Sequence, residues 1–320
     1  MPLTTELLAP TTEGYARAAQ YLGTGALVAF ATETVYGLGG DARNSAAVAA
    51  IYTAKGRPRF NPLIVHVHSV EMAERYVTIP DAARPLIARY WPGPLTLVLP
   101  LRPDAGISDL VTAGLETLAI RMPAHPVARK LLQAFDGPVA APSANPSGRI
   151  SPTTAAHVMD GLSGKIAAVL DGGPCDVGVE STILSLDPLA LLRPGGLTLE
   201  EIEACLGRAL PTGGDSDKPN APGQLKSHYA PGAAVRLNAR ARQSGEIWIG
   251  FGPDCAGAEF NLSEKGDTTE AATRLFGLLR QADRLAQEKG TNCIAVAPVP
   301  VTGLGLAVND RLDRAAAPRP

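Results

Sequence analysis

The sequence predicts an α/β protein with a mixed sheet in a larger first domain and a smaller second α/β domain. Short apolar runs alternate with helical stretches along most of the 320 residues, which is typical of an α/β layered domain. Several of these runs are separated only by turns, which favours a mixed sheet over a purely parallel one. The alternation stops at a polar, Pro- and Gly-rich segment and then resumes. We therefore assign residues 1–210 to the first domain, 211–232 to a linker or lid, and 233–320 to the second domain.

The strands of the first domain are expected where apolar runs of four to eight residues or so occur between turn residues. These runs are residues 26–31, 63–67, 95–100, 117–122, 137–141, 167–171 and 181–186. Helices are expected between several of them, at 81–90 and 125–134 among others. The stretch SAAVAAIYTAK at 45–55 is also predicted to be helical, with Asn44 or Ser45 as its N-cap and Gly56 at its end.

The second domain is predicted from a shorter set of the same signals. Strands are expected at 247–251 and 293–299, a long helix at 267–289, and a final helix before the C-terminal tail. The connecting segment 211–232 contains HYAP, and aromatic and His side chains add interaction surface that a flexible spacer lacks. We therefore expect it to act as a lid that carries site residues, with a passive tether as the alternative.

Composition excludes several classes of protein. The formal net charge of −2 argues against a general nucleic-acid coat, so any basic patch must be local. The four cysteines lie far apart without a C-x-x-C pair, and we expect them to be reduced buried thiols. We see no secretory signal peptide and no apolar run of about 18 residues that could span a membrane, and we expect a cytoplasmic protein.

A cluster of cations at Lys55, Arg57 and Arg59 stands beside a predicted buried strand. A cation at a helix C-terminus is favourable, which accounts for Lys55 alone. Gly56 and Pro58 hold the backbone in a defined turn between the three cations, and such closely spaced side chains suit an anion with several oxygens. On spacing alone both interpretations remain open.

The usual nucleotide-binding loops are absent. GLSGK at 161–165 lacks the first Gly of a Walker loop, and Ile166 stands where Ser or Thr is required. GLG at 303–305 has no third Gly at the spacing of a dinucleotide-binding loop. A nucleotide would therefore have to bind by another architecture.

Polar residues follow several predicted strands, where ligands commonly bind. Thr32, Thr34 and Tyr36 alternate where the first strand leads into an expected Gly-rich loop, and ordinary turn residues are the alternative. Ser143 and Asn145 lie between two prolines; no nearby base would activate Ser143, so we interpret it as a binding hydroxyl or a plain turn residue.

Three further residues on strands suggest buried polar contacts. His66 and His68 share one face of a strand, but no third metal ligand stands at a suitable spacing, so hydrogen-bonding histidines are favoured over a metal site. Arg121 ends an apolar strand, where an unpaired guanidinium would be costly, and we expect it to meet a carboxylate of the protein or of a ligand.

Taken together, the motifs resemble a known family. TETVYGLG at 32–39, KGRP at 55–58 with NPL at 61–63, WPGPLT at 91–96, IRMPAHP at 120–126, PSAN at 142–145, GVESTI at 178–183 and LLRPGG at 191–196 occur in one order. This order resembles the YrdC-like family of L-threonylcarbamoyladenylate synthases. PGQLKSHYAPG at 222–232 and GLGLAVNDRLDRAA at 303–316 are similar to the two-domain form of the family. Ala31 replaces a proline often seen there.

The resemblance implies a YrdC-like twisted sheet with helices around a basic cavity, followed by a Rossmann-like α/β domain. It implies the condensation of L-threonine, bicarbonate and ATP, with Mg2+ on the ATP, into threonylcarbamoyl-AMP and pyrophosphate. The product would feed the threonylcarbamoyl modification of tRNA adenosine next to the anticodon, through a downstream transferase machinery.

Site residues follow from the same resemblance. Threonine would be surrounded by Thr34, His66, Arg121, Ala141 and Ser181. ATP would be contacted by Arg57, Asn61, Thr117, Ser143, Ser151, Arg193 and Tyr229. On charge grounds we add Lys55, as a catalytic contact to phosphate or carbamate together with Arg57, and by proximity we add Asn145 to the ATP site. No metal ligand is expected from the protein itself.

Two alternatives remain from other classes. An RNA-binding module with a basic cavity is weakened by the 29 basic residues against 31 acidic ones, although weak binding of double-stranded RNA stays compatible. A carbamoyltransferase of metallocentre maturation should carry Cys-rich zinc modules, which the four scattered cysteines do not provide.

Overall fold

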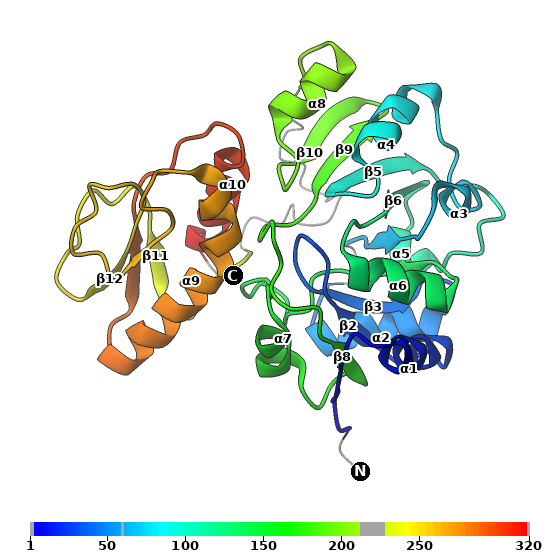
Figure 1. Cartoon of the computed structure of the whole chain (residues 1–320), viewed down its shortest axis with the longest axis horizontal. Helices are drawn as coiled ribbons and strands as arrows, with labels where there is room; N and C mark the ends of the chain where they lie inside the picture. The colour runs from blue at the N-terminus through cyan, green and yellow to red at the C-terminus, as the bar shows by residue number, and fades with distance from the viewer. Residues whose placement is uncertain (1–2, 59–60, 212–227, 319–320) are drawn as a thin grey trace.

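Two sheets organise the chain in the computed structural model, which describes residues 3–58, 61–211 and 228–318 (Figure 1). The larger sheet has ten strands in the order β1-β8-β2-β3-β7-β4-β6-β5-β9-β10, and the smaller has four in the order β11-β14-β12-β13. The larger sheet contains both parallel and antiparallel pairs, which confirms the predicted mixed sheet. The strands of the first domain are β1 (Glu6–Leu8), β2 (Val28–Phe30), β3 (Gly37–Asp41), β4 (Ile64–His66), β5 (Leu95–Pro100), β6 (Thr117–Arg121), β7 (Val139–Ala140), β8 (Ala168–Leu170), β9 (Thr182–Leu186) and β10 (Leu189–Arg193).

Helices cover both faces of the central part of this sheet. They are α1 (Thr12–Gly23), α2 (Ser45–Lys55), α3 (Val70–Glu74), α4 (Arg84–Tyr90), α5 (Asp109–Thr112), α6 (Pro126–Phe135), α7 (Ala155–Leu162) and α8 (Leu199–Leu206), with a 3-10 turn at Asp81–Ala83. Helices α1 and α6 pack side by side against Phe30 on one face. Ala29, the neighbour of Phe30 on β2, belongs to the core on the α2 face, because successive strand residues point to opposite faces.

Helix α2 begins and ends where local chemistry predicts. The Asn44 side chain accepts hydrogen bonds from the backbone N–H groups of Ala46 and Ala47, which have no partner within the helix. Gly56 adopts the left-handed conformation that closes a helix, with φ of 60°. Lys55 at the end of α2 and Arg57 just after it are both buried.

One prediction in this region was wrong. The Gly-rich stretch after β2 was expected to be a loop, but residues 37–41 form strand β3, antiparallel to β2. Glycine is poor in strands unless a close approach requires it. Here a Cβ on Gly39 would lie 2.9 Å from the Phe30 ring and 3.0 Å from a Val139 methyl group, so the tight packing of neighbours explains a glycine strand.

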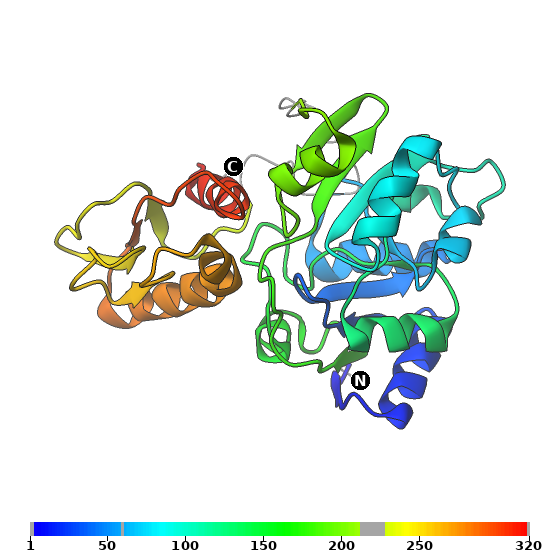
Figure 2. The same cartoon turned by 45° about the horizontal axis from the view of Figure 1, so that its top comes forward.

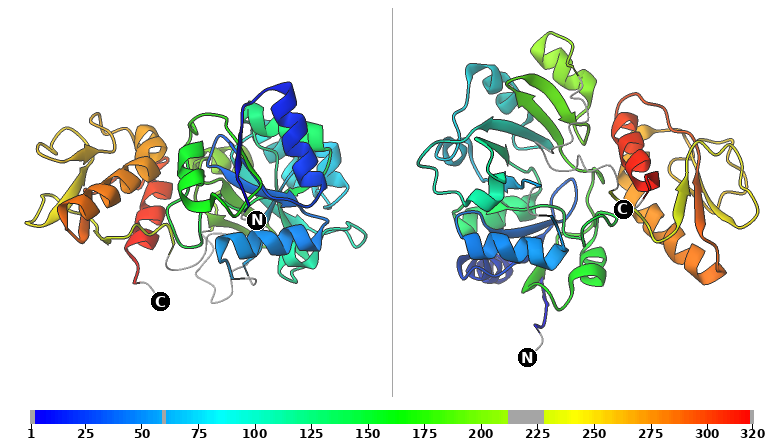
Figure 3. Two further views of the ribbon diagram at one scale, coloured as in Figure 1. Left: turned by 90° about the horizontal axis from the view of Figure 1, so that it is seen from below. Right: turned by 180° about the vertical axis from the view of Figure 1, so that it is seen from behind.

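The second domain contains a parallel sheet with two helices. Its strands are β11 (Ala234–Arg236), β12 (Glu246–Gly250), β13 (Phe260–Asn261) and β14 (Cys293–Val296), and its helices are α9 (Thr268–Lys289) and α10 (Gly305–Ala316). All of its strand pairs are parallel, which confirms a smaller α/β unit. Figures 1 and 2 show α9 and α10 on the side that faces the first domain, with the sheet on the outer side, and the back view in Figure 3 agrees.

One apolar cluster contains residues of both domains. Val35, Ile150 and Val179 of the first domain pack with Leu275 and Phe276 of α9. The loop that carries Val179 therefore belongs to the first domain by sequence and to the core of the second domain by packing. This shared core places α9 and α10 beside the loops at one end of the large sheet.

Parts of three predictions lie outside the described residues or need correction. The proposed linker or lid at 211–232 falls outside them from 212 to 227, and Arg59 of the cation cluster also lies outside them. Of the four cysteines, only Cys175 is buried, and Cys205, Cys255 and Cys293 are partly exposed, so the expectation of four buried thiols was wrong. Within the described ranges, no helix is long and apolar enough to cross a membrane.

Candidate active site

A cavity of about 50 Å3 lies where the ends of several strands of the large sheet meet. Its lining includes all five residues that the sequence predicted to contact threonine and four of the eight predicted for ATP. The predicted residues that line it are Thr34, Arg57, His66, Arg121, Ala141, Ser143, Ser181, Arg193 and Tyr229. Strand register brings these residues together. His66 and Arg121 are register partners on the parallel strands β4 and β6, and Arg121 also faces Thr96 on β5.

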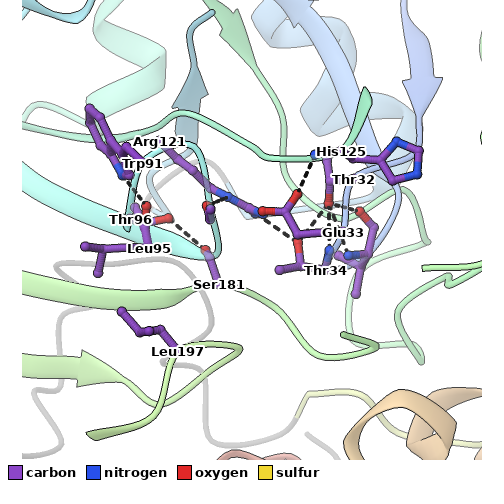
Figure 4. A network of polar contacts seen from close by, with 12 residues as sticks. Thr32, Glu33, Thr34, Trp91, Leu95, Thr96, Arg121, His125, Ser181 and Leu197 are labelled. Atoms are coloured by element: carbon purple, nitrogen blue, oxygen red, sulfur yellow. Dashed lines mark hydrogen bonds and ion pairs between the residues drawn. The ribbon is translucent and has the colours of Figure 1, made fainter. Parts of the chain in front are cut away.

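Arg121 is held by three groups of the first domain (Figure 4). Its Nη2 donates to Glu33 Oε1 at 2.7 Å, its Nη1 donates to Thr34 Oγ1 at 2.9 Å, and its Nε donates to the Gly93 carbonyl at 3.1 Å. Glu33 is buried, and the charge of Arg121 holds the pKa of its carboxyl below the ordinary value although burial alone would raise it. The carboxylate that Arg121 was expected to meet is thus one of the protein's own.

Two pairs of hydroxyl groups stand on either side of Arg121, as Figure 4 shows. Thr32 Oγ1 and Thr34 Oγ1 lie 2.8 Å apart, and Thr32 Oγ1 also donates to the Val35 carbonyl at 2.6 Å. Thr96 Oγ1 and Ser181 Oγ lie 2.7 Å apart. Thr32 and Thr34 both line the cavity, as alternation predicted, because the side chains of alternate residues in an extended chain point the same way. Tyr36 does not line it, because its hydroxyl donates to the Gly173 carbonyl at 2.7 Å.

His66 contributes a neutral imidazole to the cavity. Burial lowers its pKa to about 3, and the positive charge of Arg121 adds to the effect. The ring meets Phe30 edge-on, with 6.2 Å between centroids. A neutral imidazole offers one donor and one acceptor, which suits recognition of a polar ligand without adding charge.

Two buried arginines bring positive charge to the same cavity. Arg57 and Arg193 are buried, and burial lowers the pKa of each to about 10, so both remain cationic at neutral pH. Arg57 Nη2 donates to the Pro62 carbonyl at 3.1 Å, and Arg193 Nη2 donates to the Ser181 carbonyl at 2.8 Å. These contacts fix the guanidinium groups at the cavity wall in advance of any ligand, which is how a preorganised anion site is built.

Lys55 lies behind the wall instead of in it. Its ammonium group donates to the backbone carbonyls of Ser143 and Asn145, at 2.6 Å and 2.5 Å, and burial lowers its pKa well below the ordinary value. The Lys55 side chain therefore fixes the backbone of the loop PSAN at 142–145. Its predicted direct contact with phosphate or carbamate stays a prediction that this geometry does not favour.

The remaining predicted residues also lie outside the cavity wall. Asn145 donates through Nδ2 to the carbonyls of Pro146 and Arg149, and Ser151 donates to Glu180 Oε1. Thr117 lies half-buried at the start of β6, where it pairs with Pro100. Asn61 is fully buried. Within the described ranges, neither the nitrogen nor the oxygen of its side-chain amide has a hydrogen-bond partner. An unpaired buried amide is costly, so Asn61 fits a site that a ligand completes.

Sequence reasoning missed several residues that the structure brings to the cavity. They are Val35, Gly37, Ile64, Pro142, Glu180 and His228. Glu180 and His228 lie in the motifs GVESTI and HYAP, so the motifs were recognised while these two side chains were not singled out. Burial and the nearby cations Arg57 and Lys55 hold the pKa of His228 well below its ordinary value, so His228 is neutral.

The donor set does not form a metal centre. Among the described residues, no group of three or more His, Cys, Asp and Glu side chains could hold a metal ion. His68, considered with His66 as a ligand pair, directs Nε2 to Asp136 at 3.1 Å.

Comparison with known proteins identifies the family. The Sua5–YciO–YrdC family model, described as "Telomere recombination", matches residues 20–195, and a model described as "Threonylcarbamoyl-AMP synthase, C-terminal domain" matches residues 197–317. The chain is 43% identical to the threonylcarbamoyl-AMP synthase of Bacillus subtilis, over 95% of this chain and 93% of the relative. It is 45% identical to the threonylcarbamoyl-AMP synthase of Pyrococcus abyssi, over 93% of this chain and 92% of the relative.

A solved structure agrees with these matches. The crystal structure of P. abyssi Sua5 complexed with L-threonine superposes with a TM-score of 0.88 at 40% identity, covering 98% of this chain and 97% of that chain. Both domains are therefore matched in sequence and in fold. The chain belongs to the threonylcarbamoyl-AMP synthase family, in its two-domain form.

Proposed function

We propose that the protein condenses L-threonine, bicarbonate and ATP into threonylcarbamoyl-AMP and pyrophosphate, for the threonylcarbamoyl modification of tRNA. The observation that carries the proposal is that one cavity is lined by two chemically different sets of groups. Neutral His66 and the hydroxyl groups near Arg121 form one set, and the preorganised cations Arg57 and Arg193 form the other. Family membership and the threonine complex of the P. abyssi relative support the same assignment.

Threonine would bind at the wall of His66 and Arg121. The side-chain hydroxyl and the carboxylate of threonine need donors and acceptors, which Thr34, His66 and Ser181 supply. Arg121 is already paired with Glu33, whose negative charge offsets that of the guanidinium. Its role here is to donate hydrogen bonds from a fixed position. Ala141 adds an apolar surface without a polar group, suited to the methyl group of threonine.

The reaction would proceed by positioning and charge stabilisation. The amine nitrogen of threonine bonds to the carbon of bicarbonate, and a C–O bond breaks with release of water to give a carbamate. A carbamate oxygen then attacks the α-phosphorus of ATP, whose bond to the pyrophosphate oxygen breaks. Arg57 and Arg193 would stabilise the charge on the phosphate oxygens. No covalent nucleophile is needed: Ser181 shares its hydroxyl with Thr96 and accepts from Arg193, so it has no general base, and burial raises the pKa of the Cys175 thiol.

Mg2+ would accompany ATP as part of the substrate. Among the described residues that line the cavity, Glu180 carries the only carboxylate, and that carboxylate is already bonded to Ser151 and Arg311. The phosphate oxygens and water would therefore supply the magnesium ligands, as is common for nucleotide enzymes.

The cavity must widen before ATP can bind. Pockets that enclose ligands of this size hold roughly 300–1,000 Å3, whereas the present cavity holds about 50 Å3. Tyr229 and His228 lie in the wall and reduce this space. Weaker ATP binding in Tyr229→Ala would indicate that the ring contacts the nucleotide, and tighter binding would indicate that it only fills space.

The test is a labelled-substrate assay. Purified protein with ATP, Mg2+, L-threonine and radiolabelled bicarbonate should form a labelled adenylate and release pyrophosphate in equal amounts. Omitting threonine should abolish both products. A pure, folded preparation that forms neither product would overturn the proposed function.

A further inference from the structure

A guanidinium group of the second domain is bonded to the wall of the cavity. Arg311 of α10 is fully buried, and its Nε donates to Glu180 Oε2 at 2.7 Å. The other oxygen of Glu180 accepts the hydroxyl of Ser151 at 2.5 Å. Arg311, Glu180 and Ser151 thus form one chain of buried polar contacts. The first two are 131 residues apart in sequence and join the two domains.

Arg311 also contacts Tyr229, another residue of the cavity wall. Its guanidinium carbon lies 5.2 Å from the centre of the Tyr229 ring, within the range of a cation–π contact. The ring stacks on Phe276 of α9 at 5.5 Å between centroids. Tyr229 has a φ of 62°, a conformation that bulky side chains rarely adopt, so this packing holds the residue in a strained backbone state.

The loop that carries Glu180 also packs against helix α9 of the second domain. Thr273 Oγ1 of α9 donates to the Asp176 carbonyl at 2.7 Å, and Val179 is buried in the core around α9. A Cβ on Gly178 would lie 2.4 Å from the Cα of Thr273, so the loop and the helix are in backbone contact. The second domain therefore positions the backbone before Glu180 through α9 and the side chain of Glu180 through Arg311.

The charge of Glu180 explains why the contact with Arg311 matters for ATP binding. The groups that face Glu180 are Arg311, Arg193, Lys55, Tyr229 and Ser151. A carboxylate without its own partner at this wall would repel the phosphates of ATP and compete for Arg193. With Arg311 bound to it, Glu180 is neutralised locally, and Arg193 stays directed at the cavity. The charges of Arg311 and Arg193 also hold the pKa of Glu180 below its ordinary value against the effect of burial.

We propose that Arg311 is a positioning residue of the ATP site, through which the second domain holds Glu180, Ser151 and Tyr229 in the geometry that binds ATP. The inference rests on the proposed function and deepens it, because it assigns the second domain a part in nucleotide binding. A purely structural Arg311 would instead stabilise the interface and leave ATP affinity alone.

The test compares substitutions at this chain of contacts with a matched control. The variants are Arg311→Met, Arg311→Lys, Glu180→Gln and the double variant Arg311→Met with Glu180→Gln. Arg274→Met is the control, since Arg274 is a partly exposed arginine of the same domain that pairs with Glu270 on the surface of α9. For each protein, steady-state kinetics give KM for ATP and for threonine, calorimetry measures binding of a non-hydrolysable ATP analogue, and circular dichroism measures the folded fraction.

The proposal expects a selective loss of ATP affinity. Arg311→Met should weaken analogue binding and raise KM for ATP by about 10- to 100-fold, because small displacements of positioning groups carry costs of this order. KM for threonine should change much less, and Arg274→Met should match the wild type. Arg311→Lys should recover part of the loss, since it keeps the charge but not the planar fork.

The double variant keeps the test decisive if Arg311→Met does not fold. It removes both charges of the Arg311–Glu180 pair, and Asp310, the other carboxylate that contacts Arg311, keeps its ion pair with Arg314, so the double variant should fold. Removing Arg311 should then cost less ATP affinity in the presence of Glu180→Gln than in its absence. Independent, multiplicative effects of the two changes would overturn the proposal, as would an unchanged KM for ATP in folded Arg311→Met. A wild-type protein that neither turns over nor binds the analogue would overturn the proposed function instead.

Discussion

Arg121, which lines the cavity, forms a buried ion pair with Glu33, with 2.7 Å between Nη2 and Oε1 and side-chain exposures of 4% and 10%. The pair joins the end of β6 to the loop after β2, two segments that are distant in sequence. Because the Arg121 guanidinium also bonds Thr34 and the Gly93 carbonyl, one side chain fixes two loops, the one after β2 and the one before β5, around the proposed threonine site. Stability and binding are therefore coupled at this pair.

Breaking the pair should be costly. Glu33→Gln removes the charge and leaves Arg121 buried without a counter-ion, which typically lowers the free energy of unfolding by about 3–5 kcal/mol. The displaced guanidinium should also raise KM for threonine more than KM for ATP. Urea denaturation and steady-state kinetics measure the two effects. Glu6→Gln, which breaks the exposed pair of Glu6 with Arg17, should leave both nearly unchanged; a similar loss in both variants would contradict the assignment.

His66 should make stability depend on pH. Its pKa is about 3 in the folded protein against an ordinary value of 6.5, so the unfolded chain binds a proton that the folded protein does not. The contribution of neutral His66 is fully present above pH 6.5 and is lost as the pH falls toward 3, with a slope of at most about 1.4 kcal/mol per pH unit. Urea denaturation should show His66→Gln losing less stability than the wild type between pH 7 and pH 4.

A control separates burial from the loss of any histidine. His68→Gln changes a partly exposed imidazole two residues along the chain. If His66→Gln and His68→Gln alter the pH dependence equally, the burial of His66 is not its cause.

Arg57 should matter for ATP and, less strongly, for stability. Its guanidinium lines the cavity and donates to the carbonyls of Asn61 and Pro62. Arg57→Ala should reduce kcat/KM for ATP on the order of a hundredfold, because it removes a charge-assisted phosphate contact. It should also cost about 1–3 kcal/mol of unfolding free energy, since two buried carbonyls lose a donor. Unchanged turnover in Arg57→Ala would remove the residue from the site.

The close contact at Gly178 gives a test of domain docking. Gly178→Ala places a methyl group 2.4 Å from the Cα of Thr273, so α9 must shift, and the positive φ of 78° adds strain. Gly173→Ala is the matched control, with a φ of 79° and no atom near its Cβ position. Thermal unfolding and KM for ATP should be affected more by Gly178→Ala. Equal effects in the two variants would show that only backbone strain matters.

Local sequence rules determined much of the framework. Asn44 and Gly56 bound helix α2, and apolar runs marked β4, β5, β6 and β8, because caps and side-chain alternation act over a few residues. The ordered motifs also identified most of the cavity wall. These features need only neighbours in the chain, so the sequence carries them directly.

Only the tertiary structure decided which groups these residues contact. The glycines of β3 read as a loop until the ring of Phe30 and the side chain of Val139 are placed against them. Lys55 read as a phosphate contact, but the fold turns its ammonium group to the carbonyls of Ser143 and Asn145. Arg311 stood in a tail motif with no stated role, and only the docking of the second domain brings it to Glu180. Each of these outcomes depends on groups far apart in sequence, whose distances and desolvation are set when the sheet and the two domains assemble.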